Sequence, residues 1–187
     1  MTNDAVYDVL QKVYLQLSNL FDDEHMHVGG DEVTQGCLNE VQDELIAWLN
    51  DHHIPADSGN FSAVLVHYFR TKMMEKLATN PSQKKLIVWE EAFLDLQGIP
   101  NSPLNPNNTI VQLWDADYVT TMNAVLQAGY QALTANAFYI DRQVLSLTGQ
   151  THYLYIDTFQ DMYPFDLKQN LTATEEQLKL ILGAEVP

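Results

Sequence analysis

Apolar residues in this chain recur at two spacings, one typical of helices and one typical of buried strands. In residues 4–20 they return every three or four positions, which predicts an amphipathic helix. Its apolar face carries Val6, Leu10, Val13, Leu17 and Leu20. Further helices are predicted at residues 38–50, 61–78, 119–127 and 174–180. Short apolar runs predict strands at residues 25–28, 85–89, 110–114 and 130–135, with a partial strand at 181–185.

The residues between these elements favour turns and caps. Gly129 suits the position just after a helix, where the backbone becomes left-handed, and Thr174 suits a helix N-cap. Three prolines and several asparagines predict a loop at residues 98–108. Residues 138–164 are rich in aromatic side chains without a regular spacing, and we expect them to be irregular.

Strands that alternate with helices usually pair in parallel through right-handed crossovers. Two α/β architectures fit this order: an open doubly wound sheet and part of a TIM (β/α)₈ barrel. Residues at strand ends favour the barrel, because a TIM barrel gathers its active site at the carboxyl ends of its strands. Asp31, Glu32, Trp89, Trp114 and Tyr139 all lie at or shortly after such ends. We therefore predict an α/β chain that makes up part of a TIM barrel.

The charge balance and the length of the apolar runs exclude two classes of protein. The chain has 25 acidic and 9 basic residues, a formal net charge of −16. A phosphate backbone would repel it, so we expect no nucleic-acid partner. No apolar run approaches the roughly 20 residues of a membrane-spanning helix, so we expect no membrane span.

Several features bear on the route of the protein through the cell. Residues 1–9 lack the basic and apolar regions of a signal peptide. Glycosylation sequons nevertheless begin at Asn60, Asn107 and Asn170, whereas the proline after Asn80 excludes a fourth. The sequons favour a secretory route, and we expect that the targeting segment is absent from this chain.

The segment Gly29-Gly30-Asp31-Glu32 is the strongest local signal for chemistry. Two glycines let the backbone turn sharply after a strand, and the two neighbouring acids can then point in different directions. A solvated surface turn explains this segment alone equally simply. Trp89 and Trp114 favour chemistry, because sugars stack their flat C–H faces on indole rings. Taken singly, either tryptophan is explained as well by a place in the core.

The stretch His27-Val28-Gly29-Gly30-Asp31-Glu32 resembles the His-x-Gly-Gly-Asp-Glu signature of glycoside hydrolase family 20, the β-N-acetylhexosaminidases. Further matches follow in that family's order. Residues 88–93 resemble its Trp-x-Glu segment, and residues 111–114 resemble its next tryptophan strand. Residues 137–141 resemble its Tyr-Leu-Asp/Asn segment, and residues 183–185 resemble the opening of its last strand. The resemblance covers residues 1–187. It implies the C-terminal half of a TIM barrel, about strands 4 to 8, incomplete at both ends.

The resemblance implies an enzyme that removes terminal β-linked N-acetylhexosamine (GlcNAc or GalNAc). It also implies a substrate-assisted retaining mechanism, which is an exception to the two-carboxylate pattern of most retaining glycosidases. The acetamido oxygen of the sugar would attack the anomeric carbon and form an oxazolinium ion. Glu32 would protonate the leaving oxygen and then activate water. Asp31 would orient the acetamido N–H and stabilise the developing charge.

The resemblance also implies the residues that bind the sugar. Trp89 and Trp114 would surround the acetamido methyl group, Tyr139 would donate a hydrogen bond to the acetamido oxygen, and Asp141 would bind the 4- or 6-hydroxyl. No cofactor and no metal is expected. The remaining candidates for metal ligands show no ligand-like grouping: His25, His27, His52, His53 and His152.

The resemblance implies glycans ending in N-acetylhexosamine as partners, a lysosomal or secreted location, and a homodimer as a candidate assembly. By its own sequence context, Cys37 is either a buried thiol or half of a disulfide whose partner is absent. It stands where lysosomal relatives have a half-cystine. The family's early-strand arginine, acid and histidine would precede Met1, and its last Trp-x-Glu would follow Pro187.

Two other functions remain alternatives at this point. A catalytically inactive, carbohydrate-binding half-barrel or pseudoenzyme would bind sugar without turnover. An unrelated α/β enzyme with an acid pair would require the tryptophan and tyrosine matches to be coincidental. Because the expected barrel is incomplete, we predict little or no hexosaminidase activity from the 187-residue chain alone.

Overall fold

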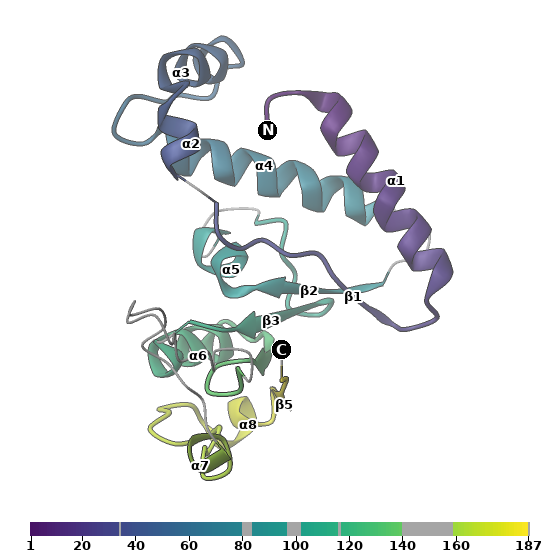
Figure 1. Cartoon of the computed structure of the whole chain (residues 1–187), viewed down its shortest axis with the longest axis vertical. Helices are drawn as coiled ribbons and strands as arrows, with labels where there is room; N and C mark the ends of the chain where they lie inside the picture. Colours follow the sequence, from purple (N-terminus) through teal and green to yellow (C-terminus); the bar gives the residue numbers. More distant parts are fainter. Residues whose placement is uncertain (34, 80–83, 97–101, 116, 140–158, 187) are drawn as a thin grey trace, which may run out of the picture. The chain divides into compact units, whose positions relative to one another are not determined.

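The computed structural model describes residues 1–33, 35–79, 84–96, 102–115, 117–139 and 159–186 (Figure 1). These residues form two compact units, Met1–Asn108 and Thr109–Pro187. No helix within the described ranges is both long enough and apolar enough to cross a membrane.

The first unit pairs two parallel strands and packs helices on one another. Its strands are β1 (His25–His27) and β2 (Lys85–Trp89), in the register His25 to Lys85 and His27 to Ile87. Its helices are α1 (Asp4–Leu20), α2 (Gln35–Asn39), α3 (Gln42–Asp51), α4 (Phe61–Ala78) and α5 (Glu90–Leu96). The long helices α1 and α4 contact each other, and α4 also contacts α3 and α5. A buried apolar cluster of Leu49, Phe61 and Leu65 joins α3 to α4.

The predicted bounds of α1, α4 and β2 are confirmed at both ends. The predicted helix at residues 38–50 is wrong, because two shorter helices, α2 and α3, meet there at a turn. Val41 has a backbone φ of −124° and ψ of 29°, which is outside the helical range, and its carbonyl accepts the amide of Leu45 to start α3. The helix α5 follows β2 without a loop and was not predicted.

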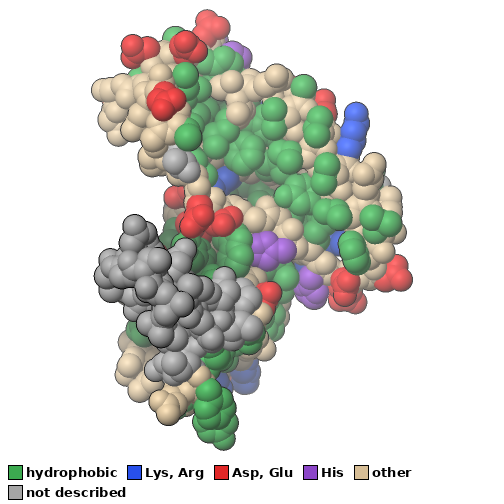
Figure 2. All heavy atoms as spheres, in the orientation of Figure 1, with side chains coloured by type: hydrophobic (Ala, Val, Ile, Leu, Met, Phe, Trp, Pro, Cys, Tyr) green, Lys and Arg blue, Asp and Glu red, His purple; other side chains and the backbone are tan. Residues whose placement is uncertain are grey.

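The apolar face predicted for α1 is mostly exposed within the first unit. Tyr7 and Ser18 are the buried side chains of this helix, whereas Leu20 is 74% exposed and Val13 is 45% exposed. Figure 2 shows apolar side chains gathered on the surface of this unit over α1 and α4. Periodicity therefore predicted the helix correctly, but the side chains that α1 buries lie beside the apolar face and not on it.

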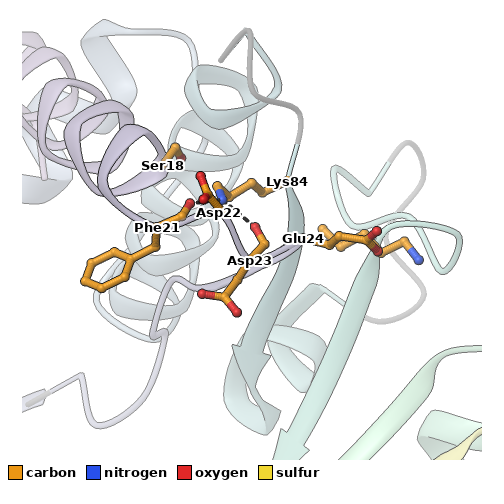
Figure 3. A pocket seen from close by; sticks show the side chains of 7 residues that line it. Ser18, Phe21, Asp22, Asp23, Glu24 and Lys84 are labelled. Atoms are coloured by element: carbon orange, nitrogen blue, oxygen red, sulfur yellow. Dashed lines mark hydrogen bonds between the residues drawn. The ribbon is translucent and has the colours of Figure 1, made fainter.

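Hydrogen bonds from Lys84 link the segment before β1 to the start of β2. Its Nζ donates to the backbone carbonyl of Phe21 at 2.6 Å and to that of Asp23 (Figure 3). A hollow of about 430 Å³ lies here, lined also by Asp22 and Glu24. This hollow lies at the amino ends of the two strands, opposite the carboxyl ends where the sequence predicts chemistry.

The second unit is a parallel sheet with short helices. Its strands are β3 (Thr109–Leu113), β4 (Gln131–Thr134) and β5 (Ile181–Ala184), with β4 paired to both others and a register shift between Ala132 and Leu133. All five residues of β3 are buried. The helices are α6 (Tyr118–Gln127), α7 (Phe159–Met162) and α8 (Glu175–Leu178). Buried side chains of α6 pack against β3 and β4: Met122, Val125 and Leu126.

The predicted caps of the second unit are confirmed. Gly129 follows the C-cap of α6 with a φ of 83°, as a C′ residue should. Thr174 accepts the amide of Gln177, whose side chain in turn accepts the amide of Thr174, so the two residues form a capping box. The irregular stretch predicted at 138–164 contains the short helix α7, while residues 140–158 lie outside the described residues.

Candidate active site

The turn that carries the two predicted catalytic acids has an unusual backbone. Gly29 and Gly30 have φ values of 73° and 113°, and Glu32 has a φ of 44°. A side chain in the left-handed region costs about 1–2 kcal/mol. Strained conformations of this kind tend to cluster at functional sites, although His53, Ala137 and Asn170 in this chain also have positive φ values. The sequence predicted a sharp glycine turn, and the structure adds that Glu32 itself is held in the left-handed region.

Backbone hydrogen bonds join this turn to the end of β2. The amide of Val28 donates to the carbonyl of Ile87 at 2.9 Å, and the amide of Trp89 donates to the carbonyl of Gly29 at 3.1 Å. A Cβ at Gly30 would lie 3.0 Å from the Cβ of Ala92 on α5. The turn therefore packs closely on β2 and α5, and only glycine fits at position 30 without displacing Ala92.

Three predicted residues of the first unit lie near one another as a result. Asp31 and Glu32 are exposed at the turn, and Trp89 is partly buried at the end of the neighbouring strand. The ring of His27 lies 4.8 Å from that of Trp89, and its Nδ1 accepts the amide of Gly29. His27 therefore contacts both the tryptophan and the turn, a role that sequence reasoning missed although the residue lies within the quoted motif.

Arg70 is a buried cation near this turn. Its side chain on α4 is 5% exposed, and Nη2 lies 3.0 Å from Oδ2 of Asp95 on α5. Burial lowers the pKa of the Arg70 guanidinium, while the charges of Asp95, Glu91 and Asp31 raise it. The sequence offered one signal for this residue, a lone arginine inside an otherwise apolar stretch of a predicted helix.

The second unit holds Trp114 and Tyr139, on the segments that follow β3 and β4. Both are partly buried. Asn136 connects the two segments, because its Nδ2 donates to the carbonyl of Asp115. The backbone amide of Asn136 also donates a hydrogen bond to Oγ1 of Thr134 on β4 at 3.0 Å. The predicted residue Asp141 lies outside the described residues.

Gln112 is a buried polar residue of β3 that sequence reasoning did not single out. It is 2% exposed, and its Nε2 donates to Oε2 of Glu185 at 2.7 Å. The amide joins β3 to the segment after β5, and its signal in the sequence was a single polar residue within an apolar strand.

Two further predictions concern metals and Cys37. Among the described residues, no three His, Cys, Asp or Glu side chains lie close enough together to hold a metal ion. Cys37 is a free and exposed thiol, so the prediction of a buried thiol is wrong. Its role as half of a disulfide stays a prediction.

The comparison with protein families settles the family. Residues 1–187 match the model described as glycosyl hydrolase family 20, catalytic domain. The chain belongs to this family. Beta-hexosaminidase subunit A1 of Dictyostelium discoideum is 28% identical over 186 residues, which are 99% of this chain and 31% of that protein. Beta-hexosaminidase subunit alpha of Mus musculus is 25% identical over 97% of this chain and 30% of its own length.

Solved structures of the family show the same fold. The GH20 exo β-N-acetylglucosaminidase of Vibrio harveyi matches with a TM-score of 0.67 and 18% identity, over 95% of this chain and 26% of its own. The N-acetyl-β-hexosaminidase of Streptomyces plicatus matches with a TM-score of 0.61, over 99% of this chain and 31% of its own. The predicted fold class, a parallel α/β chain that makes up part of a TIM barrel, is confirmed. The chain spans about a third or less of the relatives that it matches.

Proposed function

We propose that the protein containing this chain is a β-N-acetylhexosaminidase, which removes terminal GlcNAc or GalNAc from β-linked glycoconjugates. The observation that carries this proposal is the Gly-Gly turn that holds Asp31 and Glu32 beside Trp89, with Glu32 in a left-handed backbone conformation. Membership of the family makes a glycosidase role the natural one for such a turn.

The reaction that we propose proceeds in two steps. In the first, the oxygen of the 2-acetamido group bonds to the anomeric carbon while the glycosidic bond breaks, and Glu32 donates its proton to the leaving oxygen. In the second, the Glu32 carboxylate takes a proton from water, and the hydroxide adds to the anomeric carbon as the oxazolinium ring opens. Two displacements at one carbon retain its configuration, and Glu32 recovers its proton.

The remaining residues bind and orient the sugar in this proposal. Asp31 accepts the acetamido N–H and stabilises the positive charge that develops on it. Trp89 and Trp114 contact the acetamido methyl group, Tyr139 donates to the acetamido oxygen, and Asp141 binds the 4- or 6-hydroxyl. Asp31, Glu32 and Trp89 come from segments at or after the carboxyl ends of the paired strands β1 and β2, which supports their action on one sugar.

We propose a lysosomal or secreted location for the same protein. Its three sequon asparagines, Asn60, Asn107 and Asn170, are all exposed and can accept a glycan without disturbing a core. If the protein from its natural source carries these glycans, peptide N-glycosidase F will lower its apparent mass. An unchanged mass after digestion would contradict the secretory route.

The function is tested on the complete natural polypeptide that contains this chain. Aryl β-glycosides of GlcNAc, GalNAc and glucose are compared, and the first sugar product is followed by NMR. We expect cleavage of the two N-acetyl substrates with a β-configured product, and no cleavage of the glucoside, which lacks the acetamido group. Equal cleavage of the glucoside would contradict substrate assistance. Binding of GlcNAc without turnover would favour the inactive carbohydrate-binding alternative.

A further inference from the structure

Three of the polar side chains of helix α4 each have a buried side-chain nitrogen or oxygen: His67, Arg70 and Thr71. Positions three and four apart lie on one face of a helix. Each of these residues has a buried side-chain atom without a hydrogen-bond partner among the described residues, namely Nε2 of His67, Nη1 of Arg70 and Oγ1 of Thr71. This face of α4 therefore has polar groups available to bind a further partner.

Arg70 has the strongest requirement for such a partner. Its guanidinium is almost fully buried, yet its ion pair with Asp95 engages Nη2 and leaves Nη1 unpaired. A buried charge costs several kcal/mol unless its hydrogen bonds are made. Asp95 is also 47% exposed, so water weakens its contribution. A simple structural ion pair does not account for the unpaired Nη1.

The position of the acid turn offers Asp31 as an acceptor for Nη1, in addition to Glu91 of α5, whose charge also reaches Arg70. Gly30 packs on Ala92 of α5, and Asp95, three residues further along α5, lies on the same side of that helix. The turn and Arg70 therefore approach the same face of α5. Asp31, the residue after Gly30, is among the carboxylates whose charge reaches Arg70.

We propose that Arg70 is a positioning residue for Asp31, with Nη1 donating a hydrogen bond to the Asp31 carboxylate, directly or through one water molecule, when a sugar is bound. This inference rests on the proposed function. The fixed cation holds the Asp31 carboxylate aimed at the acetamido N–H.

A double-mutant cycle in the complete polypeptide tests this inference. Arg70→Met, Asp31→Asn and the double variant are assayed with an aryl N-acetyl-β-glucosaminide. We expect Arg70→Met to lower kcat by about tenfold or more with a smaller change in KM. In the Asp31→Asn background the same change should lower kcat by less than about twofold, because the carboxylate that Arg70 orients is already gone.

Two further variants separate positioning from folding. Arg70→Lys keeps the charge but not both guanidinium nitrogens, and should recover only part of the lost kcat. Lys72→Met removes an exposed cation from the same helix and should leave kcat unchanged. If Arg70→Met does not fold, judged by circular dichroism, the cycle is run with Arg70→Lys and Arg70→Gln.

The inference and the function on which it rests fail in different ways. Equal losses from Arg70→Met with and without Asp31→Asn, or no recovery in Arg70→Lys, would overturn the positioning role while leaving the function intact. Full activity of Asp31→Asn alone would instead overturn the proposed function.

Discussion

Gly30 and Glu32 determine where the proposed acids point. Both residues have positive φ values, and Gly30 also contacts α5 so closely that a methyl group there would press on Ala92. The sequence predicted the need for glycine from the sharpness of the turn. It did not predict the left-handed Glu32, because glutamate has no intrinsic preference for that conformation.

Replacing Gly30 by alanine should therefore reduce activity and stability together. The new Cβ meets Ala92 at 3.0 Å in a backbone conformation that alanine disfavours, and we expect a loss of about 1–3 kcal/mol in the free energy of unfolding. Urea denaturation and kcat of the complete polypeptide measure the two effects. Gly36→Ala is the matched control, because its Cβ would meet nothing within 4 Å in α2, so its stability should not fall. Equal stability of both variants would contradict the close packing of the turn.

At the scale of elements, hydrophobic spacing predicted helices and strands well and their surroundings poorly. The predicted bounds of α1, α4 and β2 were correct: α1 has a clear helical period and β2 is a short apolar run. The split between α2 and α3 depends on the conformation of Val41, which the spacing does not encode. Likewise, the role of Arg70 depends on contacts from α4 to α5, which are distant in sequence.

The capping box of α8 gives a prediction at this scale. Thr174→Ala removes the hydroxyl that accepts the Gln177 amide and should destabilise the start of α8 by about 1 kcal/mol. Hydrogen exchange at the Gln177 amide should become faster, while Thr174→Ser, which keeps the hydroxyl, should leave it nearly unchanged. An unchanged exchange rate in the alanine variant would show that the cap does not hold this helix.

At the scale of the whole molecule, the chain covers 31% of the Dictyostelium relative and 26% of the Vibrio structure. Apolar side chains of α1 such as Val9, Leu17 and Leu20 are exposed in the first unit. Exposed apolar surface of this kind marks an interaction site or an aggregation hazard. The sequence motifs predicted the family, but exposure is a property of the folded chain, and periodicity alone did not reveal it.

We predict little or no hexosaminidase activity from the 187-residue chain alone, because it covers only about a third or less of the relatives that it matches. The chain should also self-associate in solution through its exposed apolar surface. Aryl glycoside hydrolysis and analytical ultracentrifugation measure the two properties. Turnover by a monodisperse 187-residue chain at the rate of the complete polypeptide would contradict this prediction.

The most direct test of the account compares two glutamates at opposite ends of the same pair of strands. Glu32→Gln and Glu24→Gln are made in the complete polypeptide and assayed with 4-methylumbelliferyl N-acetyl-β-glucosaminide. Glu32 follows β1 and would carry the proton, so its loss should lower kcat by at least about 100-fold. Glu24 lines the hollow before β1, and its loss should leave kcat unchanged. Full activity of Glu32→Gln would contradict the account.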